Sequence, residues 1–396
     1  MSDAGPGGDN PFEGLPMFRD LARLFAGQGP INWDIARQIA LWTATEGTAE
    51  PNVNPVERIR LEELLRVADL HVSDATGLPT TISGGLLSIA PTTRADWALQ
   101  TLQAWRPFLE RLATAVSAAG EAEGTGPDPA TQLLGDLGRV VGPVLLGMQS
   151  GYMVGHLGRQ ALGQYDLPLP RGTSDKLLVV PANITAFAGD WSIPEDDLRL
   201  WILLEEVTRH AVLGRPHVRA RLEALVDDYV GRFEIDGDAL EGSFADIDPT
   251  DPSSFAKALS PETLLGIMQT PAQREVAARI EVLLAALAGY VDHVLDTVGE
   301  RVVGGHGRIA EALRRRRVES SEGTRFAERL LGLHMGAGRY EKGQAFVEGI
   351  VERAGEEGLA RLWKSERELP TPAELDAPGL WLARIDLGGG GGGGGR

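Results

Sequence analysis

The sequence predicts a mostly α-helical fold with one small β element. Apolar residues recur at helical spacing through most of the 396 residues, whereas residues 176–184 form the short aliphatic run that is typical of a strand. Hydrophobic residues make up 43% of the chain, which is enough for a packed core and excludes wholesale disorder.

The apolar stripes predict the helices in order along the chain. We expect them at 18–25, 33–42, 56–67, 95–119, 130–162, 193–213, from 217 onward, and at 271–298, 309–316, 324–333, 340–354 and 357–363. Glycine recurs throughout 130–162, which we interpret as close helix packing or kinks rather than a ligand channel.

The two ends of the chain lack such stripes. Residues 1–16 contain four Gly and three Pro, and residues 388–396 are a glycine run that ends in arginine. We expect 1–16 to be a disordered lead and 388–396 to be a flexible poly-Gly tail. Residues 17–387 are predicted to form one unit, in which 17–118 make an N-terminal helical part.

The composition excludes several classes of protein. The formal net charge is −18, which argues against binding of nucleic acid or of an anionic membrane surface. The chain has no cysteine, so disulfides, Cys-ligated zinc, iron–sulfur clusters and thiol nucleophiles are excluded. The N-terminus has no signal peptide, and no stretch of about 18 apolar residues lacks charge. We therefore expect a cytoplasmic protein with no membrane span.

None of the common cofactor-binding or nucleophile motifs indicates a function for this chain. The chain has neither a P-loop nor a G-x-S-x-G nucleophile elbow. Residues 305–310 match G-x-G-x-x-A, but they follow a predicted helix rather than a strand, so we interpret them as a loop. The basic run at 314–317 is predicted to form a solvated face or to pair with the acidic surplus of the chain, more than to contact phosphate.

One helix carries an unusual charged cluster. Residues 197–213 are strongly apolar, yet they contain Glu205, Glu206, Arg209 and His210. Residues at positions i and i+4 share a helix face. Zinc hydrolases use this spacing, with two His ligands at i and i+4 and a general-base Glu after the first His.

At this point the chain resembles a known family. Patches at 29–40, 162–170, 177–184, 289–293 and 314–317, together with the 205–210 helix, are similar to the zincin-like family of actinobacterial hydrolases and zinc-dependent metalloproteases. Some relatives are associated with coenzyme F420 biosynthesis. The resemblance covers nearly the whole chain. It implies a zincin-like unit over 17–387, with a metallopeptidase-like part at 130–387.

Carried over residue by residue, the family's zinc site is degenerate here. The resemblance places the first His ligand of H-E-x-x-H at Glu205, the general base at Glu206 and the second His ligand at Arg209. It places a third ligand, a glutamate on a later helix, at Ala288. Only Glu206 matches. Arginine offers only donors and cannot bind zinc, so we expect no metal and no cofactor, although zinc is bound in the family's metal-binding members.

Three functions remain open from the sequence. The preferred one is a zincin-like protein that has lost zinc and catalysis, with Glu205 and Arg209 as an ion pair, and that acts as a binding or scaffold protein for a protein, peptide or small-molecule ligand. The first alternative is an active metal-dependent hydrolase that uses Glu206 and His210 in a reorganised site. The second is a structural or regulatory helical protein with a vestigial cleft. A candidate polar cleft would contain His210, Asp292 and His293, with His217 nearby in sequence.

Overall fold

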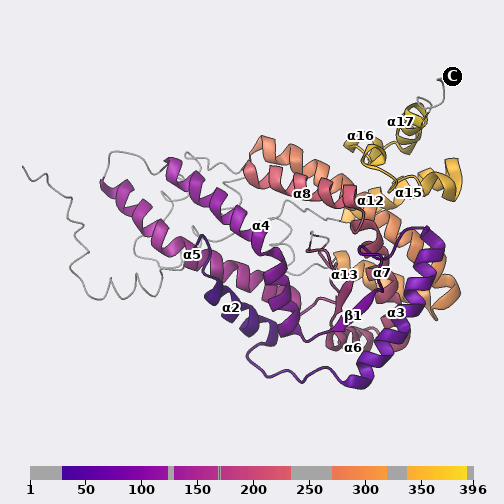
Figure 1. Cartoon of the computed structure of the whole chain (residues 1–396), viewed down its shortest axis with the longest axis horizontal. Coiled ribbons are helices and arrows are strands. Elements are labelled where there is room, and N and C mark those ends of the chain that lie inside the picture. Colours follow the sequence, from indigo (N-terminus) through magenta and orange to yellow (C-terminus); the bar gives the residue numbers. More distant parts are fainter. Residues whose placement is uncertain are drawn as a thin grey trace, which may run out of the picture.

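The computed structural model describes residues 29–123, 129–167, 169, 171–232, 270–318 and 337–389. This part of the chain is mostly helical with one two-stranded sheet, which confirms the predicted fold class (Figure 1). The predicted lead at 1–16 and the helices predicted at 18–25 and 324–333 lie outside the described residues. Helix α17 (Pro378–Gly389) extends two residues into the predicted glycine tail, and the rest of that tail also lies outside.

Three long helices pack together in the N-terminal half: α2 (Trp33–Thr45), α4 (Arg94–Glu123) and α5 (Pro129–Gly158). Helix α2 begins at Asn32, whose side chain accepts a hydrogen bond from the backbone N–H of Ile35 at 3.1 Å. Helix α3 (Pro55–Thr76) packs instead on α7 (Glu195–Leu213) at the other side of the molecule (Figure 1).

Glycines of α5 allow α2 to approach its backbone. A Cβ atom at Gly147 would lie 2.5 Å from the carbonyl oxygen of Asn32, and one at Gly155 would lie 2.6 Å from that of Ala40. Gly151 meets the carbonyl of Ala36 in the same way. The two helices therefore run parallel in close contact, as the packing interpretation of these glycines predicts.

The small sheet is parallel and pairs β1 (Ser88–Pro91) with β2 (Lys176–Val179), with Ser88 opposite Lys176. The second strand is shorter than the predicted 176–184 because Pro181 begins helix α6 (Pro181–Asp190). Proline has no N–H to continue a strand ladder, and its φ fits the first helical turn. The sequence analysis missed β1.

The C-terminal half is built around α7 and α12 (Pro271–Val302). The surrounding helices are α8 (Pro216–Gly231), α13 (His306–Val318), α15 (Ala337–Leu359) and α16 (Pro372–Leu375). Helix α12 is long and apolar enough to cross a membrane, but 72% of its apolar window is buried, as in the core helix of a soluble protein. Residues 305–310 lead from α12 into α13, so the G-x-G-x-x-A match belongs to a helix–helix connection.

Candidate functional site

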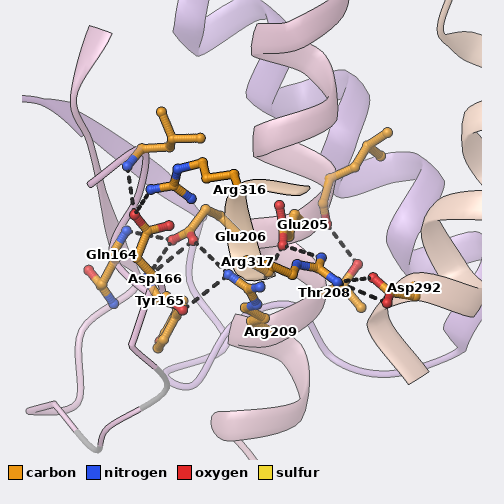
Figure 2. Close-up of polar contacts among 12 residues, drawn as sticks. Gln164, Tyr165, Asp166, Glu205, Glu206, Thr208, Arg209, Asp292, Arg316 and Arg317 are labelled. Atoms are coloured by element: carbon orange, nitrogen blue, oxygen red, sulfur yellow. Dashed lines mark hydrogen bonds and ion pairs between the residues drawn. The ribbon is translucent and has the colours of Figure 1, made fainter. Parts of the chain in front are cut away.

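Helix α7 is buried around most of its circumference, including Glu205, Glu206, Thr208 and His210. Burying an ionised side chain is costly unless it is paired and hydrogen-bonded. Each buried charged group on α7 therefore needs an internal partner, and Figure 2 shows the partners of Glu205, Glu206 and Arg209.

Glu205 lies between two arginines. Its Oε1 accepts hydrogen bonds from Nη2 of Arg209, at 2.5 Å, and from Nη2 of Arg317, at 2.9 Å (Figure 2). Burial opposes the negative charge, but the attraction of Arg209 and Arg317 outweighs it and lowers the pKa of Glu205 below its ordinary value. The i, i+4 pair expected from the sequence is thus present, and a third group from α13 completes it.

Arg317 joins three helices. Its Nη1 lies 2.8 Å and 2.9 Å from the two carboxylate oxygens of Asp292 on α12, and its guanidinium lies 5.4 Å from the ring centre of Tyr340 on α15. We call Glu205, Arg209, Asp292 and Arg317 the Glu205 network. The neighbouring Arg316 contacts Asp166 at 2.8 Å. The basic run of α13 therefore pairs with acidic side chains, which is one of the two arrangements expected from the sequence.

Glu206 holds the segment 162–166 against α7. Its Oε2 accepts a hydrogen bond from the backbone N–H of Gln164 at 2.7 Å, and both carboxylate oxygens lie 3.1 Å from the backbone N of Tyr165. Gly163 makes this approach possible, since a Cβ there would lie 2.6 Å from Cγ of Glu206. Burial raises the pKa of Glu206 to about 8, and nearby Asp166 and Glu205 add to the shift against the opposing effect of Arg209. The Glu206 side chain, which the resemblance places at the general-base position, thus contacts backbone and is only 2% exposed.

Both ring nitrogens of His210 are engaged. Its Nδ1 lies 2.7 Å from the hydroxyl of Tyr165, and its Nε2 lies 3.3 Å from Oδ1 of Asp175. Burial raises the pKa of Tyr165 and lowers that of His210, so the phenol stays protonated and the imidazole stays neutral. We therefore assign the Tyr165 hydroxyl as donor to Nδ1 and Nε2–H as donor to Asp175. His210 has no free lone pair for a metal ion.

The residues present do not fit a zinc ion. At the three ligand positions that the resemblance implies, Glu205 is bound by two guanidinium groups, Arg209 has no lone pair to offer, and Ala288 has no polar atom. Within the described residues, no group of three His, Asp or Glu side chains is placed to hold a metal ion.

The other candidate residues have separate partners. Asp292 belongs to the Glu205 network, whereas Nε2 of His293 pairs with Glu356 on α15 at 2.9 Å. His217 lies in the first turn of α8, and its Nε2 is buried without a partner in the described part of the chain. A small hollow adjoins the network beside Asp292 and Arg317, and its other walls include Trp201, Asp296 and Gln344.

The sequence alone did not indicate the residues that contact Glu206 and His210 from other segments of the chain. Gln164, Tyr165 and Asp166 lie 29 to 31 residues before α7, which begins at Glu195, and Asp175 reaches α7 from the position just before β2. Asp175 also accepts hydrogen bonds from the backbone of Ile82 and Ser83. The resemblance included the patch at 162–170, and that patch was the one available signal.

The protonation of Glu206 predicts a pH-dependent stability. Because its pKa is raised in the folded chain, the folded chain keeps a proton that the unfolded chain loses between the ordinary Glu pKa, about 4.3, and about 8. This group therefore lowers the stability as pH rises through that window, by at most about 1.4 kcal/mol per pH unit. Glu206→Gln removes this contribution. We expect urea unfolding curves from pH 5 to pH 8 to show the wild type losing stability relative to Glu206→Gln, and a constant difference would contradict the assignment.

The chain is similar to a known protein family and to a solved structure. The profile of the family described as zincin-like metallopeptidase matches residues 31–382. A crystal structure described as a putative hydrolase with a novel fold, from Chloroflexus aurantiacus, is similar with a TM-score of 0.61 and 24% identity over 90% of this chain and 99% of that chain. At this identity the likeness shows a shared fold alone. No curated protein is a significant match.

Proposed function

The chain belongs to the zincin-like metallopeptidase family, and from this premise we propose that it is a member that has lost zinc and peptide hydrolysis and acts as a binding or scaffold protein. In this proposal the degenerate H-E-x-x-H helix serves to hold the fold together. The Glu205 network and the Glu206 contacts join α7, α12, α13 and the segment 162–166.

One observation carries the proposal: Arg209, at the position that the resemblance assigns to the family's second ligand, has its guanidinium bound inside the fold. It donates to Glu205 at 2.5 Å and to the backbone carbonyl of Tyr165 at 3.0 Å. A permanently charged donor at this place repels a divalent cation and supplies it with no electron pair.

The alternative of an active hydrolase that uses Glu206 and His210 has no comparable support. A general base needs a carboxylate oxygen that can reach a water molecule, and the oxygens of Glu206 instead accept backbone hydrogen bonds. A metal ligand needs a free imidazole nitrogen, and both nitrogens of His210 are engaged.

We propose that the partner is a protein, a peptide or a small molecule, bound in the cytoplasm. The net charge of −18 opposes binding to negatively charged partners such as nucleic acid or an anionic membrane surface. The feature that supports a binding role is a family match over residues 31–382 in a chain that lacks the zinc-binding side chains implied by the resemblance.

Hydrolysis assays test the proposal directly. The full chain is incubated with denatured casein and a mixed peptide library, with and without added zinc, beside Glu206→Gln as the matched variant. We expect no cleavage above the background in either protein. Zinc-dependent cleavage by the wild type that Glu206→Gln abolishes would overturn the proposal, because it would show a working general base.

A further inference from the structure

Helix α3 exposes an apolar stripe on the face opposite its buried side. The buried side contains Leu61, Leu65, Ala68 and Val72, which pack toward α7 and the core. On the outer side, Val56 is 69% exposed, Ile59 57%, Val67 39% and Leu70 66%. Several exposed aliphatic side chains aligned on one helix face mark an interaction surface more than isolated exposed residues do.

The spacing of this outer face follows a heptad. Val56, Ile59, Glu63, Arg66 and Leu70 are separated by three, four, three and four residues. This is the a/d pattern by which two helices pack side by side. Figure 1 shows α3 at the edge of the molecule, and the exposed fractions of Val56, Ile59 and Leu70 show that its outer face is open.

Two opposite charges interrupt the stripe at its centre. Glu63 and Arg66 are exposed, and neither has an ion-pair or hydrogen-bond partner in the described part of the chain. In the middle of an a/d face they oppose association with a purely apolar helix, because each would be desolvated without a partner.

We propose that the partner of this face is a second copy of the chain, with the two α3 helices antiparallel across a two-fold axis. Placing the axis between Glu63 and Arg66 brings Glu63 opposite the partner's Arg66, and by symmetry Arg66 opposite the partner's Glu63. The same register brings Ile59 opposite the partner's Leu70, and Leu70 opposite the partner's Ile59. Every a position then meets a d position, as antiparallel helix packing requires.

The charges select this arrangement over a parallel one. In a parallel pair in register, Glu63 would face the partner's Glu63 and Arg66 the partner's Arg66, which is repulsive at both layers. The apolar layers alone would tolerate either orientation. Glu63 and Arg66 thus supply the specificity, and Ile59 and Leu70 supply the buried surface.

The contact is small. From Val56 to Leu70 the stripe is about 21 Å long at a rise of about 1.5 Å per residue. Two helices in contact over this length bury less than the roughly 1,600 Å² of a standard interface. We therefore expect a reversible dimer whose population depends on concentration in the micromolar range.

A charge exchange tests the proposal. Sedimentation velocity is run on the full chain over a range of micromolar concentrations, with Glu63→Arg, Arg66→Glu and the double variant. Each single change places like charges at both central layers and is expected to raise the dimer Kd by about tenfold or more. The double change restores both pairs and is expected to restore dimerisation to near the wild-type level.

Two further variants complete the design. Arg58→Glu makes the same charge change as Arg66→Glu, but at an exposed position of α3 outside the stripe. It is expected to change the dimer Kd much less than Arg66→Glu does, since only the net charge differs. Leu70→Asp is expected to give monomers, with circular dichroism to show that α3 still folds. A monomeric wild type, or a dimer that the single charge changes leave intact, would overturn the proposal. Neither result bears on the loss of zinc, which the hydrolysis assays test separately.

Discussion

Replacing Glu205 with alanine is expected to lower the free energy of unfolding by about 3–5 kcal/mol. The substitution removes the acceptor shared by Arg209 and Arg317, and leaves two largely buried guanidinium groups close to each other without the carboxylate between them. Breaking a buried ion pair is far more costly than the pair's net contribution, because the remaining charge stays desolvated.

Glu311 provides a matched control for this prediction. It also pairs with two arginines, Arg314 and Arg315, but all three side chains are about half exposed. We expect Glu311→Ala to change the free energy of unfolding far less than Glu205→Ala does, because all three partners stay solvated. Urea unfolding of the two variants under one set of conditions makes the comparison. Equal effects would show that the Glu205 network is solvated and contributes no more than a surface pair.

Replacing Gly163 with alanine is the second large expected effect. A Cβ at this position would lie 2.6 Å from both Cγ and Oε1 of Glu206, so either the segment 162–166 or the carboxylate must move. Moving the segment breaks the backbone hydrogen bonds to Glu206, and moving the carboxylate buries it without them. We expect a loss of about 1–3 kcal/mol or more.

Thermal and urea unfolding of Gly163→Ala are compared with Gly172→Ala, where a Cβ would meet nothing within 4 Å. The Gly172 variant is expected to be neutral or slightly stabilising, because alanine restricts the unfolded chain. If the contact with Glu206 causes the loss, Gly163→Ala will cost less in a Glu206→Ala background. The same cost in both backgrounds would show that the strain lies elsewhere.

Much of the fold was predictable from local patterns. The helical periodicity of the apolar residues predicted six of the long helices, namely α2, α3, α4, α5, α7 and α12. Such a pattern arises locally, because a helix that packs on a core repeats its apolar residues at helical spacing. Strand β1 was not predictable in this way. It has only four residues and exists because β2, 88 residues later, pairs with it in parallel.

In the candidate site, too, the contact within one helix was predictable and the contacts between distant segments were not. The i, i+4 spacing on one helix predicted the pair of Glu205 and Arg209. The third member, Arg317, comes from 112 residues away, and the contacts of Glu206 and His210 depend on how the segment 162–166 folds back over α7. Spacing along a chain carries no information about such contacts.

The measurement that tests the proposed loss of zinc most directly is the metal content of the full chain. The protein is purified without a polyhistidine tag, incubated with zinc, desalted and analysed by elemental mass spectrometry. The arrangement of Glu205, Arg209 and His210 predicts that no stoichiometric zinc is retained. One zinc ion per chain in the wild type that is lost in His210→Ala would contradict the account, because it would show that the imidazole binds a metal ion rather than Tyr165 and Asp175.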